Sequence, residues 1–429
     1  MPTLPGNNAQ VSLSSDSGTA NYTFPLILVT SLFFMWGFAY GLLDSLNKHF
    51  QDVFQMTKLR STLLQVAYFG GYFLMALPAG IIMKKFGYKR GIILGLLLYA
   101  TGALLFYPSA KSASYYFFLF SMFVLACGLC CLETASNPYV TVLGKRDTSE
   151  MRLNLAQCFN GVGSFLGPFI AAYIFFGESK PDAGQDAASL SSNLSAVQYT
   201  YVIIGVVVLL IAFLFYRSHL PEINEEEQLR ESAHHRSRPL FQNRHFVWGV
   251  IAQFFYVAAQ VGVAALFINY ATENWVGATA EKAAKLLGAS LVLFTIGRFV
   301  GTALMRVLKP ALLLTLYSIM NVLLCLVVIY GSGAFAVYAL MMVFFFESIM
   351  FPTIFALGVK DLGKHTKRGG SFQIMAIVGG AVIPPIMGWM ADRVSTPAAY
   401  WVPLICFVVV LYYGAAGHKI QVPKEAVAS

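Results

Sequence analysis

Charged residues are scarce in this sequence of 429 residues. They make up 11% of it, and only 20 residues are Asp or Glu. Soluble globular domains contain about 25% charged residues, so the scarcity argues against a soluble enzyme. Hydrophobic residues make up 57% of the chain, which excludes a disordered protein, because disordered chains have few apolar residues. The composition predicts a protein that is embedded in a lipid bilayer.

Cysteine is also rare, and its pattern indicates no metal site. The six cysteines all lie within apolar stretches. Cys127, Cys130 and Cys131 are close together, but no histidine or acidic residue stands at the spacing of a metal ligand set. We interpret them as small buried residues. No stretch combines a nucleophile, a base and an orienting group, so we expect no enzyme, no metal and no cofactor.

The apolar residues are gathered into twelve stretches, each long enough to cross a bilayer as a helix. They lie at residues 24–47, 61–83, 91–109, 115–143, 153–176, 198–216, 246–271, 286–305, 311–330, 334–358, 370–390 and 399–417. A membrane β-barrel would instead show segments of about ten residues that alternate polar and apolar. The predicted fold class is therefore an all-α membrane protein with twelve transmembrane helices.

Most of the 29 Lys and Arg residues lie in every second connector and in the C-terminal tail. These connectors are residues 84–90, 145–152, 217–244, 306–309, 360–368 and 419–424. The positive-inside rule then predicts that both termini are cytoplasmic in a multi-pass protein of the plasma membrane, which is the inner membrane in a bacterium. The same bias explains the net charge of +9, so no nucleic-acid partner is expected.

The two halves of the sequence repeat each other. Residues 133–144 read Glu-x4-Pro-x4-Leu-Gly, and residues 347–358 read the same pattern. A second match pairs Arg152, Gln157, Gly163 and Pro168 with Arg368, Gln373, Gly379 and Pro384. Parallel repeats of six helices predict two bundles that are related by an axis along the membrane normal and enclose a cavity at the midplane.

The repeat and the polar segments divide the chain into five parts. Residues 1–21 are polar and have no basic region before an apolar core, which indicates a tail and not a cleaved signal. The predicted parts are a cytoplasmic tail at 1–21, an N-terminal six-helix bundle at 22–217, a cytoplasmic linker at 218–244, a C-terminal six-helix bundle at 245–418 and a cytoplasmic tail at 419–429.

Four ionisable residues fall inside the apolar stretches: Asp44, Glu133, Arg298 and Glu347. A charge at the centre of a membrane helix costs about 2.5–3.5 kcal/mol, so such residues face protein or water. We interpret Glu133 as functional, and Asp44 as either functional or a solvated residue at the mouth of the cavity. Arg298 is interpreted as structural. Glu347 is either its partner in a structural ion pair or a transport residue.

Polar residues recur at helical spacing in four of the stretches, so each group shares one helix face. The groups are Tyr40, Asp44 and Asn47; Glu133, Ser136 and Asn137; Gln157, Asn160 and Ser164; and Gln253, Tyr256 and Gln260. Together they can line one cavity. The alternative is hydrogen bonding between helices for Gln157, Asn160 and Gln260, and simple packing for Tyr40 and Tyr256.

Such a cavity suits a neutral polyhydroxylated solute, because amides and carboxylates bind hydroxyl groups and aromatic rings stack on C–H faces. A sugar is the natural substrate. The predicted substrate-binding residues are Tyr40, Glu133, Asn137, Gln157, Asn160, Tyr256 and Gln260. Burial favours the neutral form of a carboxyl group, so Asp44 and Glu133 are the candidates for exchanging a proton as the cavity changes its exposure.

Several stretches resemble the fucose–galactose–glucose/proton symporter family of the major facilitator superfamily, over residues 24–418. They are PAGIIMKKFGYKRGI (78–92), CLETASNPYVTVLG (131–144), RLNLAQCFN (152–160), QFFYVAAQ (253–260), PTIFALGVKDLG (352–363) and TKRGGSFQIMAIVGG (366–380). The resemblance implies the twelve-helix fold and sugar uptake coupled to protons, with the two halves rocking in alternating access. It also implies that Glu133 belongs to the substrate and proton site, that Asp44 gates coupling, and that Asn160 and Gln260 lie near the sugar.

The chain departs from this family in two places. The usual acidic position of the loop after the second helix holds Lys84, and residues 40–44 read Tyr-Gly-Leu-Leu-Asp where fucose-type members have an amide-rich Asn-Asn-Leu-Asn-Asp string. Glucose, galactose, mannose and an N-acetylated hexosamine are therefore open beside fucose. The prediction is a monomeric, proton-coupled hexose symporter. The alternatives are a sodium-coupled hexose symporter, an organic-solute or drug exporter, and a nutrient sensor that does not transport.

Overall fold

The computed structural model describes residues 23–55, 63–143, 146–176, 187–218 and 239–420, and every regular element in these ranges is helical. The first half of the chain supplies α1 (Thr23–Val53), α3 (Leu63–Lys111), α4 (Tyr115–Val142), η1 (Arg146–Thr148), α5 (Ser149–Phe176) and α6 (Ala187–Arg217). The predicted all-α fold class is confirmed. The predicted tails and most of the linker lie outside the described residues.

The second half of the chain supplies shorter elements. They are η2 (Leu240–Gln242), α8 (Arg244–Ala265), α9 (Phe267–Asn274), α10 (Ala280–Leu304), α11 (Pro310–Tyr330), α12 (Gly333–Glu347), α13 (Met350–Val359), η3 (Gly363–His365), α14 (Thr366–Met375), η4 (Ala376–Val378), α15 (Gly379–Arg393), α16 (Thr396–Ala399), α17 (Trp401–Tyr412) and the π-helical turn η5 (Tyr413–Gly417).

The twelve predicted stretches map onto these helices with one fusion. Ten helices of the described part are long and apolar enough to cross a membrane. One of them, the 49-residue α3, contains two predicted stretches, 61–83 and 91–109, and α5 carries a further one. Gly87 in α3 has φ 85° and ψ 172°, a conformation that favours glycine and that kinks the chain between its two crossings.

Four predicted stretches are interrupted where continuous helices were expected. The stretch 246–271 breaks at Leu266 between α8 and α9, 334–358 breaks between α12 and α13, 370–390 passes through η4, and 399–417 breaks at Tyr400 between α16 and α17 and ends in η5. A proline lies just after the break that follows α12. Pro352 has no N–H to give to the carbonyl of Ser348, four residues earlier, and its ring crowds that carbonyl. The Ser348 carbonyl is thereby released from the helix.

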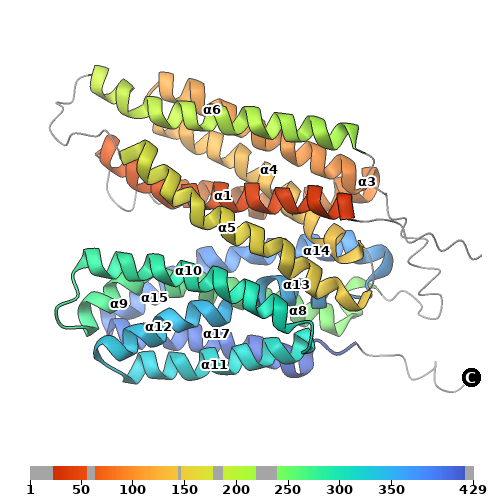
Figure 1. The fold of residues 1–429 in the computed structure, drawn as a ribbon, viewed down its shortest axis with the longest axis vertical. Coiled ribbons are helices and arrows are strands. Elements are labelled where there is room, and N and C mark those ends of the chain that lie inside the picture. Colours follow the sequence, from red (N-terminus) through yellow and green to blue (C-terminus); the bar gives the residue numbers. More distant parts are fainter. Residues whose placement is uncertain (1–22, 56–62, 144–145, 177–186, 219–238, 421–429) are drawn as a thin grey trace, which may run out of the picture.

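The helices form two groups that lie one above the other in Figure 1, with α1 to α6 in the upper group and α8 to α17 in the lower. Glycines let helices approach closely within each group. A Cβ on Gly163 would overlap the Phe34 carbonyl of α1, and a Cβ on Gly379 would overlap the Phe254 carbonyl of α8. Because Gly163 and Gly379 are equivalent in the sequence repeat, each half of the chain uses the same device.

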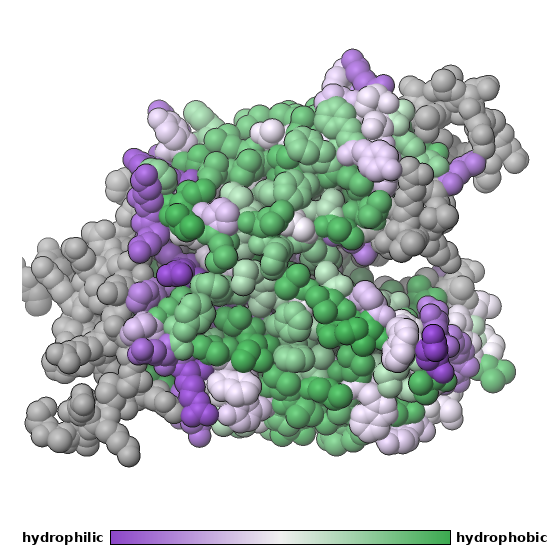
Figure 2. All heavy atoms as spheres, turned by 180° about the vertical axis from the view of Figure 1, so that it is seen from behind, coloured by the Kyte–Doolittle hydropathy of each residue, from purple (hydrophilic) through white to green (hydrophobic). Residues whose placement is uncertain are grey.

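The outer surface is hydrophobic over its middle and hydrophilic at both ends (Figure 2). Large apolar side chains such as Ile81, Phe213 and Trp389 are exposed there. A soluble protein rarely exposes apolar side chains over so wide an area. The band is therefore the surface that contacts lipid, as the composition predicts.

Basic connectors of the two halves meet at one end of the molecule. The Lys89 ammonium group donates hydrogen bonds to the carbonyls of Tyr216 (3.0 Å) and Ser218 (2.7 Å). The Lys367 ammonium group lies 4.9 Å from the ring centre of Tyr88. We call this end, which carries residues 84–90 and 360–368, the basic face.

Candidate functional site

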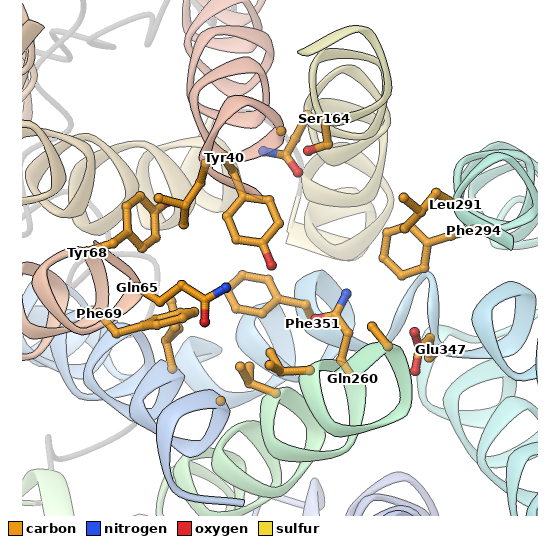
Figure 3. A pocket seen from close by; sticks show the side chains of 18 of the residues that line it. Tyr40, Gln65, Tyr68, Phe69, Ser164, Gln260, Leu291, Phe294, Glu347 and Phe351 are labelled. Atoms are coloured by element: carbon orange, nitrogen blue, oxygen red, sulfur yellow. The ribbon is translucent and has the colours of Figure 1, made fainter. Parts of the chain in front are cut away.

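A cavity of about 650 Å³ lies between the two groups of helices (Figure 3). Its lining comes from α1, α3, α4 and α5 on one side and from α8, α10, α12, α13, η4 and α15 on the other. The polar and ionisable side chains of the lining are Tyr40, Gln65, Tyr68, Tyr72, Glu133, Gln157, Asn160, Ser164, Gln260, Thr295, Arg298 and Glu347. The cavity is thus shared between the two repeated halves.

Aromatic rings form much of the wall. The rings of Tyr40 and Tyr68 are 6.1 Å apart, and those of Tyr68 and Tyr72 are 5.1 Å apart. In Figure 3 the Tyr40 hydroxyl points into the cavity, towards Phe351 and the amide of Gln260 from the other half. A ring face beside amide and hydroxyl groups can hold the apolar and polar sides of a small solute at once.

Glu133 lies on α4 at the wall of the cavity. It is only 4% exposed, and its carboxyl group has Tyr72 and Asn137 as neighbours. A carboxyl group in this setting is almost withdrawn from water yet still in contact with the cavity. Such a group can bind a proton or a hydroxyl group of a solute.

Arg298 on α10 joins the two halves across the floor of the cavity. Its Nη1 donates hydrogen bonds to the Gln157 carbonyl (2.7 Å), to Gln157 Oε1 (3.3 Å) and to Asn160 Oδ1 (3.1 Å), all on α5. Its Nε donates to the Ser348 carbonyl at 3.1 Å, which is the carbonyl that Pro352 released. The guanidinium group also lies 4.6 Å from the ring centre of Phe294.

One of the two alternatives for Glu347, an ion pair with Arg298, does not form. Helices α10 and α12 pack together as that prediction required. Among the described residues, neither Glu347 carboxylate oxygen has a hydrogen-bond partner, and the Glu347 side chain is fully buried. The donors of Arg298 are directed to α5 and to Ser348 instead.

Other predicted site residues fall into three groups. Tyr40, Gln157, Asn160, Ser164 and Gln260 line the cavity. Ser136, Asn137, Gln253 and Tyr256 are fully buried behind its wall and are not among the lining residues. The side chains of Asp44 and Asn47 lie outside the described part of the structure, although both residues belong to α1.

Four polar residues line the cavity that were not predicted from the sequence: Gln65, Tyr68, Tyr72 and Thr295. A signal for three of them was present. Gln65, Tyr68 and Tyr72 follow i, i+3 and i+7 spacing, so they share one face of α3, and Gln65 is the polar residue of an otherwise apolar turn. Thr295 stands among Leu, Phe and Ile, where a single hydroxyl is too common to single out.

The two halves are sealed together at the basic face. Lys360 Nζ, directly after the end of α13, lies 2.7 Å from Glu150 Oε1 of α5 in a salt bridge between the halves. The Asn154 amide donates a hydrogen bond of 3.1 Å to Thr353 Oγ1, again between the halves. The cavity lining lies deeper than this seal, and the surface is indented between the halves at the far end (Figure 2). The cavity is therefore closed at the basic face.

The cavity between two repeated helix bundles defines a class of membrane transporters, and comparison with known proteins identifies the family. Residues 26–372 match the Major Facilitator Superfamily. The chain belongs to this superfamily, whose members are transporters and not enzymes.

Individual relatives are similar over nearly the whole chain. The L-fucose-proton symporter of Escherichia coli (strain K12) is 40% identical over 422 residues, which cover 94% of this chain and 95% of that protein. The glucose/galactose transporter of Brucella abortus biovar 1 (strain 9-941) is 36% identical over 421 residues, covering 97% and 99%. The crystal structure of the transporter FucP in the outward conformation superimposes with a TM-score of 0.82 at 38% identity, covering 92% of this chain and 98% of that one.

Proposed function

We propose that the protein is a symporter that carries a neutral hexose together with a proton by alternating access. The observation that carries this proposal is the lining of the cavity, which places amides, hydroxyls, aromatic faces and the Glu133 carboxyl group around one space shared by both halves. Relatives named as an L-fucose-proton symporter and as a glucose/galactose transporter support it. An exporter of lipophilic solutes would need a more apolar lining.

The orientation in the membrane follows from the charge bias. We assign the basic face to the cytoplasm because Lys and Arg accumulate on the cytoplasmic side. Both termini are then cytoplasmic, and the cavity, closed at the basic face, is the outward-facing state. Residues 22–217 and 245–418 are the two halves that rock, and a monomer is sufficient because a single chain encloses the cavity.

The proposed cycle uses the carboxyl group of Glu133 as the shared proton and substrate site. A proton bound there neutralises the carboxylate, and the sugar then binds Glu133, Asn160 and Gln260 while it stacks on the aromatic wall. Rocking inward closes the outer end and separates the basic-face seal. Crossing with a bare carboxylate in a closing, drier cavity is costly, so sugar and proton move together. Asp44 is proposed to gate this coupling.

Purified protein in liposomes tests the proposal. Radiolabelled L-fucose, galactose, glucose, mannose and N-acetylglucosamine are offered under an imposed proton gradient or an imposed sodium gradient. We expect accumulation of one or more of these sugars under the proton gradient, and its collapse when a protonophore is added. Accumulation driven by sodium alone would identify a sodium symporter. Uptake that responds to neither gradient would contradict symport.

A further inference from the structure

Glu347 is a second carboxyl group at the cavity, in the half of the chain opposite Glu133. The two residues occupy equivalent places in the sequence repeat, each five residues before a proline. Both line the cavity, and Figure 3 shows Glu347 at its edge below Phe294. Glu347 is fully buried, and neither of its carboxylate oxygens has a hydrogen-bond partner in the described part of the chain. A structural carboxylate would be expected to accept hydrogen bonds.

Among the described residues, one positive charge lies near Glu347. The charged and titratable neighbours that interact with Glu347 are Arg298 on α10, Tyr256 on α8 and Cys325 on α11. Helix α9 contributes Tyr270, whose hydroxyl donates to the Val328 carbonyl, and α13 carries no titratable residue. Within the described residues, Arg298 is therefore the group that can compensate an ionised Glu347.

Arg298 is occupied elsewhere in this conformation. Its Nη1 donates to Gln157 and Asn160 on α5 of the first half, and its Nε donates to the Ser348 carbonyl. Arg298, Ser348 and Glu347 all belong to the second half and move together. Gln157 and Asn160 belong to the first half. When the halves separate at the floor of the cavity, Arg298 loses its partners on α5 and keeps Glu347 as a neighbour.

We infer that Glu347 is a second proton-binding residue of the cavity, which holds a proton in this conformation and releases it when Arg298 turns to it. This inference rests on the proposed symport. The step breaks the O–H bond of the Glu347 carboxyl group and passes the proton to cytoplasmic water, while the carboxylate that remains accepts hydrogen bonds from the guanidinium group. On return to the outward-facing state, Arg298 rebinds Gln157 and Asn160, and Glu347 takes back a proton by way of the cavity that it lines.

The ratio of protons to sugar tests this inference in liposomes. Opposing sugar and proton gradients are balanced until net flux stops, and the balance point gives the number of protons carried per sugar. We expect at least two for the wild type and one fewer for Glu347→Gln, which keeps the shape of the side chain and cannot bind a proton. Glu273→Gln makes the same change at an exposed site outside the cavity and should keep the wild-type ratio.

Two results would overturn the inference: a wild-type ratio of one, or an unchanged ratio in a folded Glu347→Gln variant. If the wild type shows no coupling at all, the proposed symport fails instead. If Glu347→Gln does not fold, infrared spectroscopy of the Asp44→Asn, Glu133→Gln double variant decides the question, because a protonated carboxyl group has its own C=O band. If the band of a buried protonated carboxyl group persists in this variant, it supports proton binding by Glu347. The absence of that band overturns the inference.

Discussion

The guanidinium Nη1 of Arg298 lies 3.1 Å from Asn160 Oδ1, and this hydrogen bond crosses from one half of the molecule to the other. The Nε of the same guanidinium group donates a hydrogen bond to the Ser348 carbonyl. This carbonyl has no helical donor because Pro352, four residues later, has no N–H. A charged link between the halves thus forms the floor of the cavity. The floor cannot open to the basic face until this link breaks, so Arg298 stabilises the conformation that is closed at the basic face.

Arg298→Met should shift the protein towards the inward-facing state. Hydrogen bonds to a charged group contribute about 1.5–3 kcal/mol each, and about 1.4 kcal/mol is a tenfold change in an equilibrium. We expect a shift of about tenfold or more. Spin labels at Tyr116→Cys and Val276→Cys, both exposed and one in each half, should move closer together when the outer end closes. Pulsed electron resonance measures the distance between them.

The labelling needs one precaution and one control. Five of the six native cysteines are buried, and Cys127, which is partly exposed, is replaced by serine. Lys309→Met removes a positive charge from an exposed position of the same half and should leave the distances unchanged. A distance distribution in Arg298→Met that matches the wild type would show that the link does not hold the outward-facing state.

The salt bridge at the basic face should act in the same direction. Glu150 is 2% exposed, so Lys360→Met leaves an almost buried carboxylate without its partner across the halves. The loss of such a partner typically costs about 2 kcal/mol or more. We expect the same pair of spin labels to report a shift to the inward-facing state. The Glu150→Lys, Lys360→Glu double variant restores an ion pair and should reverse the shift, and a failure to reverse it would argue against a role for the pair.

The fold could be predicted from sequence because the bilayer makes simple demands on it. Helix length is set by membrane thickness, and the repeat of residues 133–144 in 347–358 indicates two equivalent halves. The interruption near Pro352 could not be predicted from the proline alone, because Pro138, at the equivalent place in the repeat, lies inside the continuous helix α4.

The partners of Arg298 could not be predicted in this way. Three of its hydrogen bonds go to α5, which is distant in sequence and belongs to the other half. Such contacts depend on how far the two halves have closed, which no local pattern records. The packing of α10 on α12 made an ion pair between Arg298 and Glu347 a reasonable alternative. It does not form because Arg298 donates to the acceptors on α5 and to the Ser348 carbonyl instead.

Close helix packing in the first half should limit substitutions at Gly128. A Cβ there would overlap the backbone nitrogen of Tyr99 on α3, which cannot move as a flexible side chain could. Overpacking of this kind costs about 1–3 kcal/mol. Gly128→Ala should therefore unfold at a lower temperature in detergent, followed by intrinsic fluorescence.

Gly288→Ala is the matched control for that measurement. It makes the same change in α10 where nothing lies within 4 Å of the added Cβ. Alanine in a helix interior is favoured over glycine by about 0.5–1 kcal/mol. Its unfolding temperature should equal or exceed that of the wild type, and equal melting of the two alanine variants would show that α3 and α4 can move apart at low cost.

Glu133→Gln should abolish accumulation driven by a proton gradient while sugar binding persists. Glutamine has nearly the same shape and can still hydrogen-bond a hydroxyl group, but it cannot bind and release a proton. Sugar binding is measured on purified protein by scintillation proximity, and accumulation is measured in liposomes.

Asp392→Asn is the control for these measurements. It neutralises an exposed carboxylate of α15 and should leave both measurements at wild-type values. Normal accumulation by Glu133→Gln would assign proton coupling to other carboxyl groups, and loss of binding together with accumulation would make Glu133 a substrate ligand whose charge is required.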